Sequence, residues 1–209
     1  AVKLGKRNLY TIEHLLSSLA GCGLSYIHFE VEGKEIPLLD GSAIEWVRSF
    51  EEVGIKKVPK PTNFMKEINE PKIFNKNSSV IAATPSSKLT IVSTIDFPYE
   101  AIGKQTFVID LNPKCFVEMI APARTFGFKD QFEELSELGL IKGGSLENAL
   151  VCDGDKWVNP PLRFDNEPIR HKILDLIGDL ALVGLPKAQI LVYKGSHSLN
   201  ALLASSLQS

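Results

Sequence analysis

The sequence predicts an α+β fold made of two related layers. Strand-like segments with alternating apolar residues are concentrated between residues 64 and 111, as in "SVIAATP" and "KLTIVSTIDF", and indicate a sheet with several antiparallel pairs. One arrangement also occurs twice: "IEHLLSSLAGCGLSYIHFEV" and "RHKILDLIGDLALVGLPKAQILVY" are each a histidine-bearing helix, a glycine stop and a strand. The repetition predicts two layers packed face to face, with the starts of the two helices meeting.

The first part of the chain is expected to contain two helices and a strand. The first helix spans residues 11–22, and an alternating strand follows at residues 25–33. A loop with turn residues, "IPLLDGSA", leads into a second helix over residues 43–54. The candidate N-caps are Thr11 for the first helix and Asp40 or Ser42 for the second.

A stretch rich in proline and lysine, "KKVPKPTN" at residues 56–63, is typical of a domain boundary and divides the chain into residues 1–58 and 59–209. The second domain is expected to contain most of the regular structure. Its expected elements are strands at residues 64–68, 79–85, 88–97, 105–111, 148–152 and 188–193, and helices at residues 113–120, 130–138, 168–183 and from about residue 198.

The composition argues against some classes of protein. A net charge of −2 argues against nucleic acid as the main partner, since no strongly basic surface is implied. No apolar run approaches the roughly 20 residues needed to span a bilayer. The chain has three cysteines, Cys22, Cys115 and Cys152, which lie far apart and lack the spacing of metal ligands. This pattern favours reduced thiols over a disulfide framework. The chain lacks an initiator Met, so a targeting segment could lie upstream.

The expected helix at residues 168–183 carries a polar stripe. His171, Asp175 and Asp179 are four residues apart, so they lie on one line, with about 40° between successive members. The residues on the opposite side are apolar and should face the core: Ile169, Ile173, Leu176, Ile177 and Leu180. The stripe is either a solvated helix face or part of a metal site, because a histidine and an aspartate at positions i and i+4 can coordinate one ion.

A catalytic zinc site would need a third protein ligand, and the chain has four histidines. His28 is expected to be an ordinary residue of an alternating strand. His14 follows Glu13, which offers a ligand beside a carboxylate that could act as a general base. In the alternative interpretation, Glu13 is an acidic residue in the first turn that interacts favourably with the helix dipole, and His14 lies on the surface. His197 stands in a polar turn before the last helix, exposed for acid–base chemistry.

Six ordered motifs, taken together, resemble those of one enzyme family. They run from residue 11 to about residue 200: "TIEHLLSSLAG", "EIPLLDGSA", "ARTFGF", "GLIKGGSLENALV", "LRFDNEPIRHKILDLIGDLALVG" and "HSLN". The sequence resembles the UDP-3-O-acyl-N-acetylglucosamine deacetylase family, the zinc hydrolases of lipid A biosynthesis. The resemblance implies two α+β layers that sandwich the site, with a hydrophobic passage for an acyl chain. It also implies a zinc-dependent amidohydrolase that releases acetate from the UDP-sugar.

The resemblance further implies roles for individual residues. The zinc ligands are His14, His171 and Asp175, from "TIEH" and from the first and fifth residues of "HKILD". The matches to catalytic groups are Glu13 as general base, His197 as proton donor to the departing amine, Asp179 as the acid that orients and charges His197, and Thr125 as a group that holds the oxyanion. The matches to substrate-binding groups are Lys172 for the diphosphate, and Phe126 and Phe128 for the nucleotide sugar and its acyl chain.

The sequence departs from the family pattern at its start, where several strands normally precede "TIEH". We therefore expect a first domain that is incomplete at its N-terminus. A shortened, inactive homologue that binds zinc or the nucleotide sugar without turnover is the alternative, and another zinc amidohydrolase is a more distant one. The expected partner is the UDP-sugar substrate, without nucleic acid, and the chain is expected to be monomeric. Its expected location is cytoplasmic if bacterial and the mitochondrial matrix if of the plant type.

Overall fold

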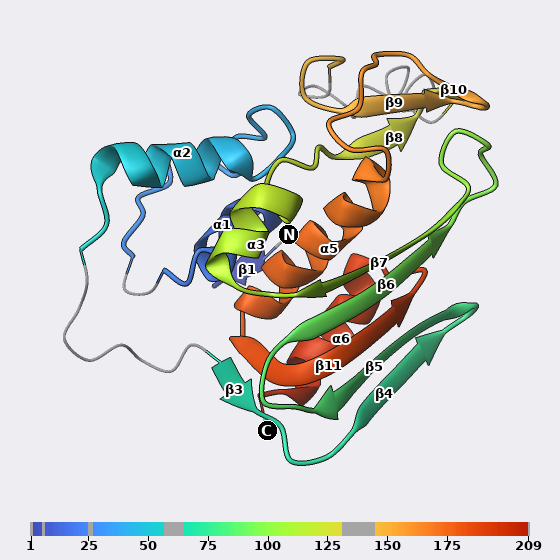
Figure 1. Cartoon of the computed structure of the whole chain (residues 1–209). Coiled ribbons are helices and arrows are strands. Elements are labelled where there is room, and N and C mark those ends of the chain that lie inside the picture. Colours follow the sequence, from blue (N-terminus) through green and yellow to red (C-terminus); the bar gives the residue numbers. More distant parts are fainter. Residues whose placement is uncertain (1, 6, 25–26, 57–64, 131–144, 209) are drawn as a thin grey trace.

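The computed structural model describes residues 2–5, 7–24, 27–56, 65–130 and 145–208. It confirms the α+β class, because a large sheet covers helices from both ends of the chain and a small sheet stands beside it (Figure 1). None of the helices in these ranges is long and apolar enough to cross a membrane. The expected helix at residues 130–138 and the expected boundary at residues 56–63 lie almost entirely outside the described residues.

The large sheet has six strands. They are β3 (Met65–Glu67), β4 (Lys72–Lys76), β5 (Ser79–Pro85), β6 (Thr90–Asp96), β7 (Lys104–Asp110) and β11 (Leu185–Tyr193). The order is β4-β5-β11-β6-β7, and β3 pairs with the first residues of β11. The expected antiparallel pairs are confirmed between β6 and β7 and between β5 and β11, whereas β11 runs parallel to β6. The strand β4 was not predicted; a two-residue turn with Asn77 at φ 54° joins it to β5.

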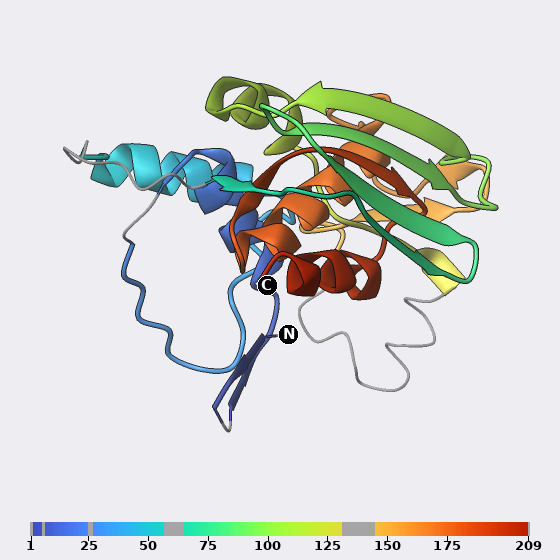
Figure 2. The ribbon, with the colours of Figure 1, turned by 90° about the horizontal axis from the view of Figure 1, so that it is seen from below.

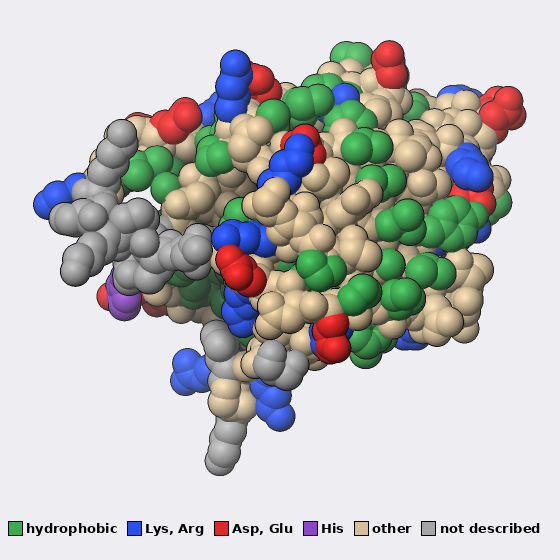
Figure 3. All heavy atoms as spheres, turned by 60° about the horizontal axis from the view of Figure 1, so that its bottom comes forward, with side chains coloured by type: hydrophobic (Ala, Val, Ile, Leu, Met, Phe, Trp, Pro, Cys, Tyr) green, Lys and Arg blue, Asp and Glu red, His purple; other side chains and the backbone are tan. Residues whose placement is uncertain are grey.

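The strands alternate in sequence because the sheet buries one face against the helices. On β6, Ile91, Ser93 and Ile95 are buried, and the residues between them are half-buried on the other face. That outer face carries an aliphatic row in register across five strands, formed by Ile73, Ala82, Leu191, Val92 and Val108. The surface in Figure 3 accordingly shows hydrophobic side chains interspersed with charged and polar ones.

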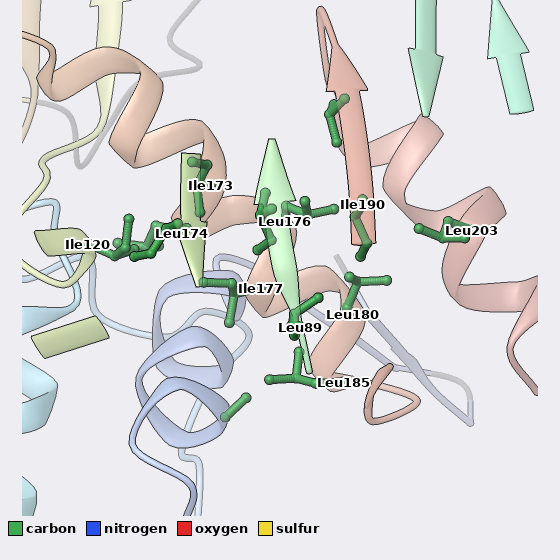
Figure 4. Packing of buried hydrophobic residues seen from close by; sticks show 14 of the residues in the cluster. Leu89, Ile120, Ile173, Leu174, Leu176, Ile177, Leu180, Leu185, Ile190 and Leu203 are labelled. Atoms are coloured by element: carbon green, nitrogen blue, oxygen red, sulfur yellow. The ribbon is translucent and has the colours of Figure 1, made fainter. Parts of the chain in front are cut away.

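Three helices lie on the buried side of the sheet. They are α1 (Glu13–Gly21), α5 (Glu167–Ala181) and α6 (His197–Ser206). The helix α5 lies between the sheet and α1, and α6 packs beside it under β4 and β5 (Figure 2). The five apolar residues of α5 that were predicted to face the core are all at most 2% exposed: Ile169, Ile173, Leu176, Ile177 and Leu180. Four of them, Ile173, Leu176, Ile177 and Leu180, belong to one buried cluster with side chains such as Ile190 of β11 and Leu203 of α6 (Figure 4). Ile169 belongs to a second cluster, with Ile95 and Cys152.

The start of the chain differs from the prediction. The strands β1 (Val2–Leu4) and β2 (Arg7–Leu9) form a hairpin that projects from the body (Figure 2). The prediction that Thr11 caps α1 is wrong, because the N-cap is Ile12 and no side chain caps this helix. Thr11 instead has a positive φ of 55°, and its hydroxyl donates a hydrogen bond to Glu35. The Thr11 side chain therefore links two loops and does not cap the start of α1.

The predicted strand at residues 25–33 is wrong for its described part, residues 27–33, which form no strand. Ile27, Phe29 and Val31 alternate as expected, yet each is 41% exposed. The nearest strand-like pairing in the described chain joins Tyr10 to residues 34–36. An alternating sequence becomes a strand only where a neighbour takes its N–H and C=O groups, and residues 27–33 have none among the described residues.

The remaining elements frame the end of α5 that carries His171. The helix α2 (Ile44–Val53) is confirmed, but its N-cap is Ala43; Ser42 lies before it and still accepts a hydrogen bond from the Ile44 N–H at 3.2 Å. The expected helix at residues 113–120 is confirmed as α3 (Pro113–Cys115) followed by the π-helical turn η1 (Phe116–Ile120). The small sheet consists of β8 (Phe126–Phe128), β9 (Leu150–Asp153) and β10 (Lys156–Trp157).

Candidate metal centre and its surroundings

Three buried polar side chains meet where α1 packs against α5. His14 comes from the first turn of α1, and His171 and Asp175 come from successive turns of α5. A ligand atom of each lies within 4.8 Å of the others. The Oδ1 atom of Asp175 lies 3.4 Å from Nε2 of His171 and 4.0 Å from Nε2 of His14. The two histidine-bearing helix starts therefore meet, as the repeated arrangement predicted.

A glycine in α5 allows this approach. A β-carbon on Gly178 would lie 2.2 Å from the carbonyl oxygen of Glu13, the first residue of α1. Glycine inside a helix costs roughly 1 kcal/mol relative to alanine, so its presence here has a packing reason. Because the backbone of α1 rests directly on α5, Glu13 and His14 are brought beside His171 and Asp175.

The ring of His171 is held in one tautomer. Its Nδ1 atom lies 3.0 Å from the carbonyl oxygen of Ala123. A carbonyl oxygen only accepts, so Nδ1 carries the proton and donates this hydrogen bond. The lone pair is therefore on Nε2, which is the atom that points toward Asp175. A carbonyl partner on the distal nitrogen is the usual support of a histidine that binds a metal.

Burial keeps both histidines neutral. Desolvation lowers the pKa of His171 to about 4, and it also lowers the pKa of His14, although Asp175 acts in the opposite direction on both. For Asp175 the burial favours a higher pKa, but Lys172 and the nearby histidines outweigh it and hold the pKa well below its usual value. At neutral pH the group thus offers two neutral imidazoles and one carboxylate, the protonation state that metal binding requires.

Lys172 is the counter-charge of this carboxylate. Its Nζ donates a hydrogen bond of 2.8 Å to Oδ2 of Asp175, which leaves Oδ1 facing the two histidines. Burial acts to lower the pKa of Lys172, but Asp175 outweighs that effect and raises it. The lysine therefore stays charged, and the buried carboxylate is paired with a partly buried cation.

A second acid–base pair stands beside this group. Nδ1 of His197, the first residue of α6, lies 2.8 Å from Oδ2 of Asp179, and its Nε2 lies 3.9 Å from Asp175. The hydrogen bond with Asp179 is the main cause that raises the pKa of His197. The imidazole side chain is 53% exposed, so it is open to solvent and to a ligand. The stripe on α5 therefore serves two neighbouring groups, because Asp179 faces His197.

Asn200 completes this pair, and no role was predicted for it. Its amide Nδ2 donates a hydrogen bond of 2.9 Å to the same oxygen of Asp179, and the residue is 2% exposed. The sequence held one signal: Asn200 follows His197 by three residues in "HSLN", a spacing that places both on one side of a helix.

The other predicted site residues lie around this centre. Thr125 follows Ala123 by two residues, and its N–H donates a hydrogen bond of 2.7 Å to the Gly41 carbonyl. The ring of Phe126 lies 6.4 Å from the ring of His171. Phe128 stacks on Tyr99 at 4.2 Å and belongs to an aromatic cluster with Phe97 and Phe126. His28 lies in the extended segment with its side chain 85% exposed, outside any described strand, so the strand prediction is wrong for it.

The donor set fits a divalent metal ion such as zinc. Two imidazole nitrogens and one carboxylate oxygen are ligands found in catalytic zinc sites. Nδ1 of His14 is buried without a hydrogen-bond partner among the described residues, so at least one nitrogen of this ring is not satisfied by the chain. Within the same ranges, His14, His171 and Asp175 are the group of histidine, cysteine and acidic residues whose ligand atoms converge closely enough to hold an ion.

Comparison with known proteins agrees with the motifs. The model of the LpxC family, UDP-3-O-acyl N-acetylglycosamine deacetylase, matches residues 1–209. The chain belongs to this family. It is 50% identical over 205 residues to UDP-3-O-acyl-N-acetylglucosamine deacetylase from Nostoc sp., which covers 96% of this chain and 73% of that protein. The Synechocystis sp. deacetylase is 46% identical, over 94% of this chain and 72% of its own length.

The LpxC family also has plant members among the relatives of this chain. A protein from Arabidopsis thaliana named probable UDP-3-O-acyl-N-acetylglucosamine deacetylase 1, mitochondrial, is 42% identical over 218 residues. That match covers 94% of this chain and 67% of the plant protein. Cyanobacterial and plant relatives are therefore both similar over nearly the whole chain.

Proposed function

We propose that this chain is a zinc-dependent deacetylase of lipid A biosynthesis. It would hydrolyse the N-acetyl group of UDP-3-O-acyl-N-acetylglucosamine and release acetate and the free amine. Family membership supports the reaction class. The observation that carries the proposal is the convergence of His14, His171 and Asp175 beside the His197–Asp179 pair. A metal-binding group and a charged proton donor next to each other are what amide hydrolysis needs.

In this proposal His14, His171 and Asp175 hold the zinc ion. Zinc supplies a Lewis acid and lowers the pKa of water from about 15.7 to about 7. The second oxygen of Asp175 stays with Lys172, and the Ala123 carbonyl keeps the ring of His171 in place. A zinc ion held by these three residues would polarise water and the substrate carbonyl, the chemistry that catalytic zinc supplies.

Proton transfer is assigned to two residues, Glu13 and His197. Glu13 precedes His14 in α1 and takes a proton from the attacking water as general base. His197 gives a proton to the departing amine, which is a poor leaving group without one. Asp179 raises the pKa of His197 and so favours its protonated form, and with Asn200 it fixes the direction of the imidazole.

The remaining predicted residues are assigned to the substrate. The Thr125 hydroxyl would donate to the developing oxyanion. The ammonium of Lys172 would attract the diphosphate while it remains paired with Asp175. Phe126 and Phe128 of β8 would contact the nucleotide sugar and its acyl chain.

The decisive experiment measures zinc content and acetate release on one purified sample. The zinc-loaded chain is expected to hold one zinc ion and to release acetate from the UDP-sugar, and a chelator is expected to abolish the release. His197→Ala is the catalytic control, because it leaves the three proposed ligands in place. If the parent chain released no more acetate than His197→Ala, the proposed catalysis would be wrong.

The same sample distinguishes the two alternatives. Stoichiometric zinc and binding of the UDP-sugar without acetate would favour a binding protein that has lost turnover. Acetate release that UDP does not inhibit would favour another amidohydrolase with a different acylated amine as substrate.

We also propose that residues 1–58 and 59–209 are separate domains and that the chain is monomeric. Limited proteolysis and sedimentation test these proposals. For location we propose the cytoplasm for a bacterial protein and the mitochondrial matrix for a plant protein, in line with the name of the plant relatives. Tagging of the native protein in its source cell tests the location.

A further inference from the structure

A buried carboxylate stands one helical turn before His171. Glu167, the first residue of α5, is 0% exposed. Its Oε1 accepts hydrogen bonds from the backbone N–H and the Nε of Arg124, both at 2.9 Å. Its Oε2 accepts from a terminal nitrogen of Arg124 at 3.1 Å and from the Arg163 N–H at 2.6 Å. Four donors thus converge on one carboxylate that takes no part in the chemistry proposed above.

Arg163 extends this arrangement to two further loops. One terminal nitrogen donates to the Pro122 carbonyl at 2.9 Å, and the other donates to Asp40 at 2.8 Å. Asp40, Arg124, Arg163 and Glu167 therefore form a cluster with two charges of each sign, which we call the Glu167 cluster. It joins the turn at residues 40–42 and the segment at residues 122–125 to the start of α5.

Each residue of the segment 123–125 is anchored differently. The Ala123 carbonyl accepts from His171, Arg124 is bound to Glu167, and the Thr125 N–H donates to Gly41. Gly41 has a φ of +82°, and a β-carbon there would lie 1.9 Å from the Asn148 carbonyl oxygen and 3.2 Å from Cγ2 of Thr125. Arg124 is the middle residue of this segment and is bonded to Glu167 at the start of α5. The position of Glu167 therefore affects the positions of Ala123 and Thr125 relative to α5.

We propose that Glu167 is a positioning residue, which places the segment 123–125 so that the Ala123 carbonyl orients His171 and Thr125 faces the reacting amide. The inference deepens the deacetylase function proposed above and rests on it. Glu167 itself touches neither substrate nor metal. Its effect passes through Arg124 to two neighbours in the chain, one that supports a ligand and one that meets the substrate.

The ion pair of Arg124 and Glu167 orients the segment 123–125 more than it stabilises the fold. A buried pair contributes little to stability compared with apolar residues of the same size, because desolvating both charges offsets their attraction. What it does provide is direction, since the planar guanidinium meets the carboxylate through two parallel hydrogen bonds. A displacement of about 1 Å at a catalytic group can reduce a rate about 100-fold, so direction at Arg124 matters for catalysis.

Glu167→Gln is the main test on the zinc-loaded chain. The glutamine keeps one acceptor oxygen and turns an amide N–H₂ toward donors, so Arg124 and Arg163 cannot both keep their partners. We expect the His171 Nδ1–H resonance to shift or broaden in the NMR spectrum as its bond to Ala123 changes. We expect kcat for acetate release to fall about 10- to 100-fold, the usual effect of losing an outer support of a metal ligand, with KM changed by less than about threefold.

Two further variants separate positioning from general destabilisation. Ile190→Val removes a methylene from the buried face of β11, away from the cluster, and should leave the His171 resonance and kcat unchanged. Arg124→Lys keeps the charge but loses the parallel hydrogen bonds, and should show a smaller shift and a smaller loss of kcat than Glu167→Gln. If Glu167→Gln does not fold, Arg124→Lys decides the question by the same two measurements.

The inference is wrong if Glu167→Gln keeps both the parent resonance and a kcat within about twofold, or if Ile190→Val changes them as much. If the parent chain releases no acetate, the proposed function fails separately. The His171 resonance still decides then whether Glu167 sets the position of Ala123, because the comparison can be made without substrate and without metal.

Discussion

Gly178 of α5 lies directly against the backbone of Glu13, so that a β-carbon at Gly178 would come within 2.2 Å of the Glu13 carbonyl oxygen. This contact sets the distance between the helix that carries His14 and the helix that carries His171 and Asp175. The site is thus assembled from two helices whose approach depends on the absence of one side chain.

We expect Gly178→Ala to destabilise the protein, although alanine is the better helix former. The gain in helix propensity is about 1 kcal/mol, and the overlap with backbone atoms, which cannot rotate away, should cost more. A net loss of roughly 1–3 kcal/mol in the free energy of unfolding is expected, together with weaker zinc binding as α1 is pushed outward. Urea unfolding and a zinc titration measure the two effects.

Val53→Ala is a suitable control, because Val53 is 88% exposed at the end of α2 and its truncation should change neither quantity. Unchanged zinc affinity in a folded Gly178→Ala protein would show that α1 can reach the site without this close contact.

Zinc should stabilise the folded chain through its three ligands. Free zinc at about 100 times its dissociation constant is expected to add about 2.7 kcal/mol to the free energy of unfolding. For a chain of this size that corresponds to a rise of roughly 5–10 °C in melting temperature. A chelator should reverse the rise, and His171→Ala should abolish it, whereas His28→Ala, at an exposed histidine, should retain it. Equal shifts in both variants would place the ion elsewhere.

The pair of Lys172 and Asp175 should show strong coupling in the absence of metal. Asp175→Leu leaves the partly buried ammonium of Lys172 without its partner and is expected to cost about 3 kcal/mol. Adding Lys172→Met removes that unpaired charge, so the double variant should recover most of the loss. A double-mutant cycle measures this coupling: urea unfolding gives the stability of the parent, both single variants and the double variant. Losses that simply add would mean that the two charges do not interact across their 2.8 Å contact.

Asp179→Asn should lower the pKa of His197, since the hydrogen bond with Asp179 is the main cause that raises it. A histidine with a raised pKa stabilises the fold fully below its unfolded pKa of about 6.5. That contribution disappears as the pH rises through the higher folded pKa. The stability difference between parent and variant should therefore be largest below about pH 6.5 and shrink above it.

An NMR titration of the His197 ring follows this pKa directly, and the exposed His28 ring serves as the internal reference. If the pKa of His197 does not fall in the variant, another group, such as Asp175 at 3.9 Å, is the cause that raises it.

The sequence predicted what depends on local pattern. The helix α5, its core face and its polar stripe follow from spacing, because a helix turns by a constant angle per residue. The strands of the large sheet followed from alternation, except β4. The six motifs led to the family, which the family comparison confirms.

Local pattern predicts the wrong structure where a segment depends on a partner. Residues 27–33 alternate like a strand, but no neighbour among the described residues takes their hydrogen bonds. Thr11 has the chemistry of an N-cap and bonds Glu35 instead, because residues far apart in sequence compete for one hydroxyl. Local pattern does not reveal such competition.

The sequence by itself therefore determined the class of fold, the family and the residues with the right chemistry for a metal site. The tertiary structure decided how these groups are held: Gly178 against Glu13, the Ala123 carbonyl on His171, Asn200 on Asp179, and Glu167 among four donors. Chemical type is a property of each side chain and is visible in a sequence. Orientation depends on contacts between distant segments, and those exist only once the chain has folded.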